Sequence, residues 1–129
     1  MPDKRSHVRL TLRGRVKMKS EGEPPYIFSG ELGNISFRGF SVLVREKEGM
    51  VIEAGMVVQF ELAADLWRKP LIGKGIIRGV TKGARYGLHG MYLGVEFLDM
   101  DRNEIMLFLG RLQSRISRDK AKKNANLVI

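Results

Sequence analysis

Alternating apolar and polar residues predict that much of this chain forms β-strands. Between residues 9 and 18 the even positions are mainly apolar and the odd positions mainly basic. Because successive side chains of a strand point to opposite faces, this period of two predicts a strand over residues 9–17 with one buried and one basic face. The buried face would hold Leu10, Leu12, Val16 and Met18, and the basic face Arg9, Thr11, Arg13, Arg15 and Lys17.

Five later segments also have the pattern or composition of strands. Residues 56–62 and 91–97 alternate strictly, whereas residues 27–33 and 39–44 are more generally apolar and β-branched. Residues 71–81 predict a further strand, and their three glycines predict bulges in it. Five to seven short strands separated by turn-forming residues predict a small antiparallel barrel, in which closure removes exposed edges.

The period changes after residue 100 and predicts one helix. Its apolar residues recur at spacings of three and four, at Ile105, Phe108, Leu109, Leu112 and Ile116. This spacing forms one apolar stripe, which we expect to pack on the barrel. Asp101 and Glu104 resemble a capping box, so we expect the helix over residues 101–120 and a tail over residues 121–129.

Length and composition favour one folded domain. The 129 residues are 43% hydrophobic, which is enough for one core. We expect an arm over residues 1–9 that is flexible without ligand, followed by the barrel over residues 10–99. No apolar run reaches the roughly 20 residues of a membrane span. The N-terminus lacks the apolar centre of a secretory signal, so we expect a cytoplasmic protein.

Few residues could catalyse a reaction or bind a metal. The chain has no cysteine, and its two histidines, His7 and His89, are far apart in the sequence. This composition does not fit a metal site. Ser36 has no His or Lys at a spacing that would mark a base for a nucleophile. The residues therefore give no support for a metal cofactor or for a nucleophilic enzyme.

The charge of the chain indicates an anionic partner. The net charge is +9 and the pI about 10.2. Residues 1–19 hold seven Lys or Arg against one acid, and residues 101–123 hold seven against three. Arg111, Arg115 and Arg118 of the second group lie beside the apolar stripe of the helix. Such an excess favours a nucleotide, a nucleic acid, a membrane surface or an acidic protein as partner.

One short motif lies between two predicted strands. Asn34, Ser36 and Gly39 form the pattern N-x-S-x-x-G, with Arg38 next to the glycine. These residue types are common in turns, and a turn is one interpretation. The other is a ligand site, because the amide and hydroxyl groups can bind the edge of a nucleobase while glycine lets a ligand approach the backbone.

A second motif, R-x-x-x-R, comes directly before the first predicted strand and consists of Arg5 and Arg9. It is either a solvated basic tail or an arm that closes on a ligand. Guanidinium groups pair with phosphate through two hydrogen bonds and stack on rings. The second interpretation therefore predicts a phosphorylated ligand that contains aromatic rings.

Taken together, the two motifs and their places among the strands resemble the PilZ domain family. The segment YLGVEFLDMD, residues 92–101, is similar to the family's last barrel strand and the start of its helix. The resemblance extends from Arg5 to about Arg118. It implies a six-stranded antiparallel β-barrel with a C-terminal helix. It also implies a bacterial receptor for the second messenger cyclic di-GMP, and not an enzyme.

The resemblance implies a role for each motif residue. Arg5 and Arg9 match the arginines that hold cyclic di-GMP through phosphate contacts and guanine stacking. Asn34, Ser36 and Gly39 match the residues that hold a guanine. Asn34 stands where Asp is commoner in the family, and its side-chain oxygen can still accept a hydrogen bond from guanine without the strengthening effect of a charge.

Two basic neighbours complete the candidate site. Lys4 stands where many members of the family have a further arginine, and it can contact phosphate as a point charge. Arg38 lies next to Gly39 within the N-x-S-x-x-G motif. We therefore expect both side chains to contribute positive charge to the site of a dianionic ligand.

The first hypothesis is thus a cyclic di-GMP receptor that signals to an effector protein through a ligand-dependent change of its surface. Two alternatives stay open. One is an adaptor with the PilZ fold and no ligand. The other is a basic nucleic-acid-binding barrel, for which affinity would fall steeply with salt.

Overall fold

The computed structural model describes residues 10–11, 13–45, 47, 49–83 and 90–127. The secondary structure in these residues consists of β1 (Leu10–Thr11), β2 (Gly14–Ser20), β3 (Ile27–Ile35), β4 (Gly39–Arg45), β5 (Val57–Ala64), β6 (Leu71–Lys82), β7 (Gly90–Leu98) and α1 (Arg102–Leu127). The five later strands expected from alternation and composition are present as β3 to β7, and each begins and ends within two residues of the expected bounds.

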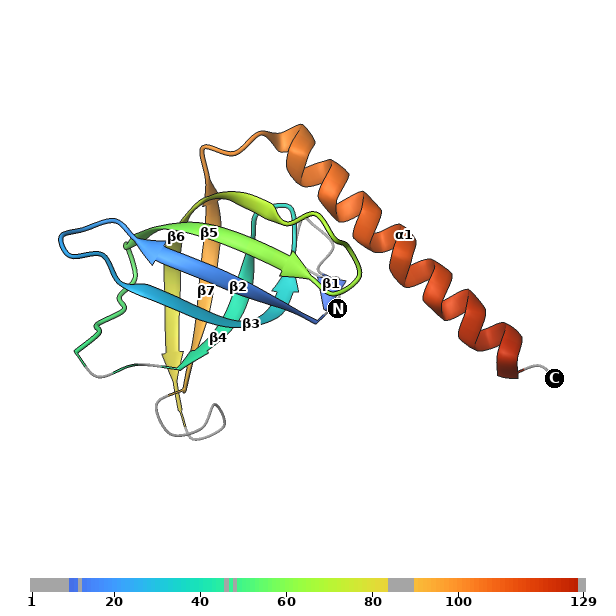
Figure 1. Cartoon of the computed structure of the whole chain (residues 1–129), viewed down its shortest axis with the longest axis horizontal. Coiled ribbons are helices and arrows are strands. Elements are labelled where there is room, and N and C mark those ends of the chain that lie inside the picture. The colour runs from blue at the N-terminus through green and yellow to red at the C-terminus, as the bar shows by residue number, and fades with distance from the viewer. Residues whose placement is uncertain (1–9, 12, 46, 48, 84–89, 128–129) are drawn as a thin grey trace, which may run out of the picture.

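Six strands form a closed ring of pairings, and Figure 1 shows the barrel that they build. They follow the order β3-β2-β5-β6-β7-β4, and β3 also pairs with β4, which closes the sheet. Every pairing is antiparallel. The short strand β1 adds to β3 outside this ring. The predicted six-stranded antiparallel barrel with a C-terminal helix is therefore confirmed.

Alternate residues of the strands fill the interior. On β2, Val16 and Met18 are buried and Lys17 between them is exposed, as the period of two predicted. Phe40 and Phe60 meet inside the barrel, edge to face, with ring centroids 5.0 Å apart. The apolar faces of strands on different sides of the barrel thus share one core.

The single strand predicted over residues 9–17 is wrong, because the chain breaks between β1 and β2. Thr11 pairs with Asn34, whereas Arg15 pairs with Glu31. The N-terminal segment advances by four residues between these two pairs, whereas β3 advances by three. The extra residue gives a local irregularity of the kind that a bulge produces. Sequence alternation does not reveal such an extra residue. Arg9 and Leu12 of the predicted strand lie outside the described residues.

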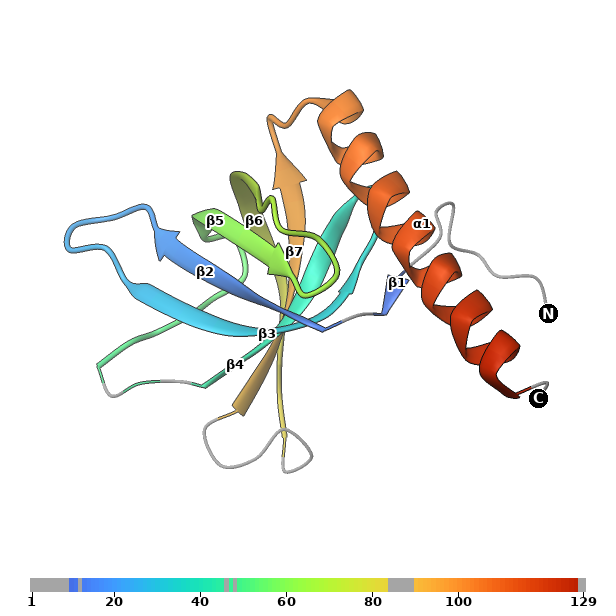
Figure 2. The ribbon, with the colours of Figure 1, turned by 45° about the vertical axis from the view of Figure 1, so that its right-hand side comes forward.

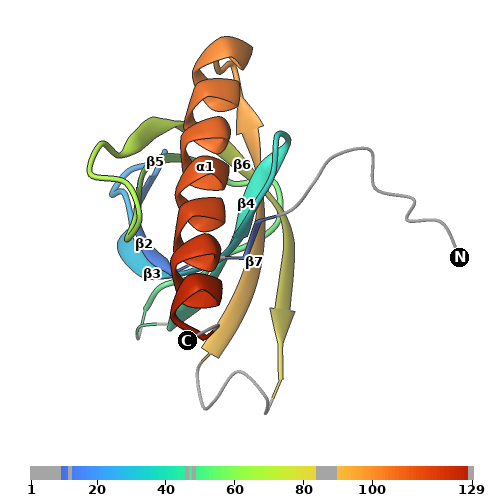
Figure 3. The ribbon, with the colours of Figure 1, turned by 90° about the vertical axis from the view of Figure 1, so that its right-hand side faces the viewer.

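Helix α1 lies along one side of the barrel, as Figures 2 and 3 show. Ile105, Phe108 and Leu112 of the predicted stripe are buried beneath it. At its start, the Asn103 backbone N–H donates to Oδ1 of Asp101 at 2.8 Å. Asp101 therefore caps the helix as expected.

The predicted end of the helix at residue 120 is wrong. The helix continues to Leu127 through part of the segment expected to be a tail, and in Figure 1 this end extends beyond the barrel. The sequence RDKAKKNANL contains no Gly or Pro that would stop it, and Ala and Lys favour helix. In the part of the chain that the structure describes, no helix has the length and apolar character needed to cross a membrane.

Candidate functional site

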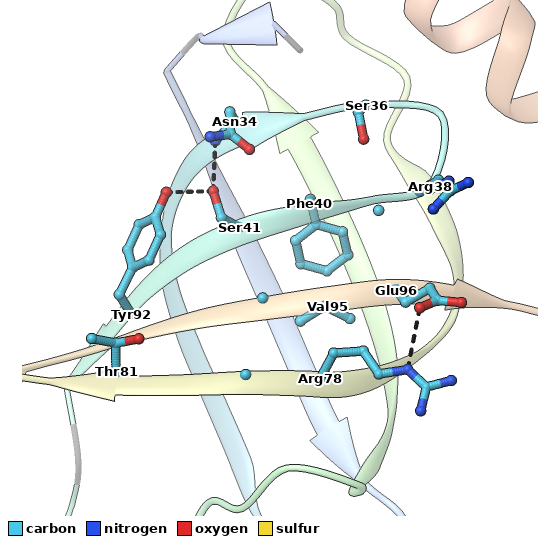
Figure 4. Close-up of a pocket in the computed structure, with 13 residues that line it drawn as sticks. Asn34, Ser36, Arg38, Phe40, Ser41, Arg78, Thr81, Tyr92, Val95 and Glu96 are labelled. Carbon is cyan, nitrogen blue, oxygen red and sulfur yellow. Dashed lines mark hydrogen bonds and ion pairs between the residues drawn. The ribbon is translucent and has the colours of Figure 1, made fainter. Parts of the chain in front are cut away.

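A groove of about 390 Å³ lies on the outer face of the barrel, where β4, β7 and β6 run side by side (Figure 4). The end of β3 and the turn between β3 and β4 form one rim, and they carry the N-x-S-x-x-G motif. The lining residues are Asn34, Ser36, Arg38, Gly39, Phe40, Ser41, Arg78, Gly79, Thr81, Tyr92, Gly94, Val95 and Glu96.

Glycines leave the floor of this groove open. Gly94 on β7 pairs with Ser41 on β4 and with Gly79 on β6. Among the described residues, a Cβ added to Gly79 or Gly94 would meet no neighbouring atom within 4 Å. The pairing shifts between Ile77 and Gly79, as the glycines of this segment predicted. A planar group could therefore lie directly on the backbone here.

Gly39 has a structural role that its sequence context did not reveal. A Cβ at this position would lie 1.9 Å from the carbonyl oxygen of Val95 and 2.9 Å from Cα of Glu96. Both atoms belong to the backbone of β7, so neither can move away as a flexible side chain would. The backbone that approaches Gly39 closely is thus that of the neighbouring strand, β7. Glycine at this position allows the start of β4 to pair with β7 directly after the turn of the motif.

Hydrogen bonds hold the turn of the motif in place. The Ser36 backbone N–H donates to the carbonyl oxygen of Gly39 at 2.8 Å. The Phe97 N–H donates to the carbonyl oxygen of Arg38, also at 2.8 Å, and ties the turn to β7. Because both bonds join backbone atoms, the side chains of Ser36 and Arg38 take no part in stabilising the turn.

A hydroxyl network positions the first residue of the motif. The Asn34 backbone N–H donates to Oγ of Ser41 at 3.0 Å, and this oxygen lies 2.6 Å from the hydroxyl of Tyr92 (Figure 4). The network joins β3, β4 and β7 at one end of the groove. It fixes the backbone of Asn34, and therefore the point from which its side chain extends, before any ligand arrives.

Three polar side chains at this rim are available to a ligand. Within the described part of the chain, the Asn34 amide, the Ser36 hydroxyl and the Arg38 guanidinium make no hydrogen bond or ion pair. Figure 4 shows Asn34 at the end of β3, with Ser36 and Arg38 on the adjoining turn. One amide, one hydroxyl and one exposed cation are thus presented along the same edge.

The opposite edge of the groove carries a second guanidinium. Nε of Arg78 on β6 lies 3.2 Å from Oε2 of Glu96 on β7. Both side chains are more than half exposed, at 59% and 51%, so this ion pair adds little stability. Arg78 can therefore exchange Glu96 for an anionic ligand at small cost. With Arg38, it places positive charge on both sides of the groove.

The structure places four of the seven predicted site residues, Asn34, Ser36, Arg38 and Gly39, at one groove. Lys4, Arg5 and Arg9 lie outside the described residues, as do His7 and His89. The chain enters the described region at Leu10, which pairs with Ile35 between Asn34 and Ser36. Arg9 directly precedes Leu10 in the sequence.

Sequence reasoning missed several lining residues, among them Ser41, Arg78 and Tyr92. Their partners are distant in sequence, and only the register of β4, β7 and β6 brings them together. A partial signal exists in the two glycines of "RGVT" and "YLGV", which mark positions in strands where a side chain is absent. Among the described residues, no group of three or more His, Cys, Asp or Glu could hold a metal ion.

Solved structures with a similar fold were found, although their sequences are distant. The inhibitor of motility MotI/DgrA of Bacillus subtilis is 15% identical with a TM-score of 0.62, and the match covers 94% of this chain and 53% of that one. The PilZ domain of YcgR from Escherichia coli, with c-di-GMP, is 11% identical with a TM-score of 0.68, over 95% and 98%.

The K. pneumonia MrkH–c-di-GMP complex is 12% identical with a TM-score of 0.69, over 92% of this chain and 56% of that one. The chain thus spans about half the length of MotI and of MrkH, and nearly all of the PilZ domain of YcgR. No curated protein matches the sequence.

The family was identified from the sequence itself. The family model described as PilZ domain matches residues 3–112. This range includes the R-x-x-x-R motif, the whole barrel and the buried part of α1. The chain therefore belongs to the PilZ domain family.

Proposed function

We propose that this protein is a cyclic di-GMP receptor and that the groove between β3, β4, β7 and β6 is its binding site. The observation that carries the proposal is the free polar rim of Asn34, Ser36 and Arg38 beside an open glycine floor. YcgR and MrkH, which have a similar fold, are described in complex with c-di-GMP. They support the choice of ligand, and the geometry of this chain supports the site.

One guanine of the ligand would lie flat over Gly79 and Gly94. Its N1–H and N2–H groups would donate to the side-chain oxygen of Asn34, and the Ser36 hydroxyl can donate or accept at the same edge. Because the Ser41–Tyr92 network already fixes the Asn34 backbone, only the Asn34 side chain has to be ordered at this position on binding.

The two phosphates would be bound by cations. Arg38 and Arg78 lie on opposite sides of the groove. Arg9 directly precedes the residue that pairs with Ile35, and Arg5 is separated from Leu10 by a chain that spans at most about 17 Å. Both arginines can therefore reach the groove, with Lys4 contributing further positive charge.

Binding would be transmitted through the arm. Between β1 and β2, the Arg13 carbonyl accepts a hydrogen bond from the Asp65 N–H at 3.0 Å, which joins the segment that follows β1 to the β5–β6 loop. A ligand that fixes the arm would act on this loop through β1 and the segment that follows it, and would change the surface offered to an effector protein. In this proposal the chain forms one PilZ domain of a bacterial cytoplasmic protein that is a receptor, not an enzyme, and needs no cofactor.

Isothermal titration calorimetry with cyclic di-GMP tests the proposal, with GTP as the control ligand. Charge-assisted hydrogen bonds contribute about 1.5–3 kcal/mol each, so Arg9→Ala should weaken binding roughly 10- to 100-fold. Ser36→Ala should weaken it about 5-fold, since it removes one neutral hydrogen bond. Lys17→Ala on β2 is the matched control. Equal binding by the wild type and Arg9→Ala would contradict the role of the arm.

One observation favours nucleic-acid binding as a second candidate. Arg15, Lys17 and Lys19 are all exposed on the same face of β2. If this face binds phosphates, affinity for an oligonucleotide should fall steeply with salt and be lowered by Lys17→Ala. Cyclic di-GMP carries two charges, so its affinity for the groove should depend on salt much less.

A further inference from the structure

A second, separate groove of about 610 Å³ lies between α1 and the β5–β6 loop. It shares no lining residue with the first groove. Trp67 of the loop forms one wall. The helix contributes Met106, Leu107, Arg111, Arg115 and Arg118.

The groove combines a fixed cation with exposed apolar side chains. The Arg111 guanidinium carbon lies 5.1 Å from the centroid of the Trp67 ring, which is a cation–π contact. Met106 and Leu107 are each 59% exposed, which is unusual for side chains of this size. Gly110 lies between them and the arginines, and a Cβ there would meet no described atom within 4 Å. The helix face therefore has room for an incoming side chain.

A buried donor at the edge of this groove is also unused. Nε1 of Trp67 is inaccessible to solvent and has no hydrogen-bond partner in the described part of the chain. Buried donors without partners are uncommon in folded proteins because they lose their hydrogen bond to water. An incoming carbonyl or carboxylate, combined with a small shift of the loop, would satisfy it.

The charge around this groove is strongly one-sided. Next to it, a smaller hollow is lined by Arg68, Lys69 and Arg115 and by a single acid, Asp65. On α1, Arg111, Arg115 and Arg118 follow at spacings of four and three, so they lie along one face over about 10 Å. A surface of this kind complements a row of carboxylates on a partner.

We propose that this groove, with its basic rim, docks an acidic amphipathic helix of a partner protein. Leucine-like side chains of the partner would cover Met106 and Leu107, and its carboxylates would pair with Arg111, Arg115 and Arg118. A nucleic acid would satisfy the arginines but leave the apolar side chains without contacts. The link to signalling rests on the proposed function, in which the Asp65–Arg13 hydrogen bond connects this loop to the segment between β1 and β2 and through β1 to the arm.

Trp67 provides a direct reporter, because it is the single tryptophan of the chain. The probe is a synthetic peptide of Glu and Leu, with Leu at helical spacing on one face. We expect saturable binding that shifts the Trp67 emission, measured without cyclic di-GMP. The double variant R111E/R115E should weaken binding more than about tenfold. The double variant K17E/K19E on β2 has the same net charge and should leave it within about twofold.

A second variant tests the apolar half of the groove. Met106→Ser with Leu107→Ser changes only exposed side chains, so it should lower the melting temperature by no more than a few degrees through helix propensity. It should weaken binding of the peptide at least about fivefold. The proposal is overturned if the peptide does not bind, if K17E/K19E weakens it as much as R111E/R115E, or if the Ser variant binds normally. Oligothymidylate or phosphatidylglycerol vesicles could also displace the peptide at a concentration below that of the peptide. That result would assign the surface to a nucleic acid or a membrane and would overturn the proposal.

The outcome is independent of nucleotide binding, which calorimetry measures on the same variants. A peptide that binds to a chain unable to bind cyclic di-GMP would establish the docking groove and refute the proposed function. Nucleotide binding without peptide binding would do the reverse.

Discussion

Replacing Gly39 and Gly94 separately by alanine should distinguish the fold from the ligand site. The added methyl group at Gly39 would lie 1.9 Å from the Val95 carbonyl oxygen, so β4 and β7 must separate. At Gly94 the same methyl group meets no described atom within 4 Å and extends into the groove. The two substitutions add the same atoms on neighbouring strands, yet we expect opposite effects.

The magnitudes follow from these contacts. Forcing a methyl group into a packed site costs about 1–3 kcal/mol, and Gly39→Ala should lie at the upper end because backbone atoms block it. For a domain of this size, about 3 kcal/mol lowers the melting temperature by roughly 10 °C. Gly94→Ala should change the free energy of unfolding by less than about 0.5 kcal/mol, since no contact is broken.

Thermal unfolding and calorimetry with cyclic di-GMP would be measured on both variants. We expect Gly94→Ala to melt like the wild type but to bind the nucleotide at least about tenfold more weakly, because its methyl group occupies the floor under the guanine. A destabilised Gly94→Ala, or a Gly39→Ala that melts like the wild type, would refute the strand packing described here. Normal nucleotide binding by Gly94→Ala would refute the placement of the base.

Three further substitutions have defined outcomes. Tyr92→Phe removes the 2.6 Å contact with the Ser41 hydroxyl and should cost about 1 kcal/mol in urea unfolding, where no change would show that the network is unimportant. Asp101→Ala removes the cap bonded to Asn103 and should lower stability by about 1 kcal/mol, with a loss of helical circular dichroism at lower urea than in the wild type. Asn34→Asp supplies a charged acceptor for guanine, so calorimetry should show cyclic di-GMP binding a few-fold tighter, and weaker binding would contradict its contact with the base edge.

Periodicity predicted the elements of this fold well. Strict alternation located β5 and β7, because their inner faces are packed on the core and their outer faces are not. The change to a spacing of three and four located α1, whose Phe108 and Leu112 are buried. Irregularities were not predictable in the same way. The break before Gly14 places one extra residue opposite β3, and neither the composition nor the alternation of this segment indicates it.

The site was predictable only where it is local in sequence. Asn34, Ser36, Arg38 and Gly39 lie on one turn, so a short motif could indicate them together. Arg78 and Tyr92 reach the same groove from β6 and β7, and their positions depend on a register shift beside Gly79. The structural reason for glycine at position 39 was not predictable either. The carbonyl group that leaves no room for a side chain there belongs to Val95, which is far away in the sequence.

An NMR titration of the isotope-labelled chain with cyclic di-GMP tests the central claim most directly, since it locates the ligand without any substitution. We expect the amide signals of Asn34, Ser36 and Gly39 to shift in a saturable way, together with those of Gly79 and Gly94 on the floor of the groove. The amide of Lys17 on β2 should stay in place. Saturable shifts confined to other strands, or no shift at saturating nucleotide, would contradict binding in this groove.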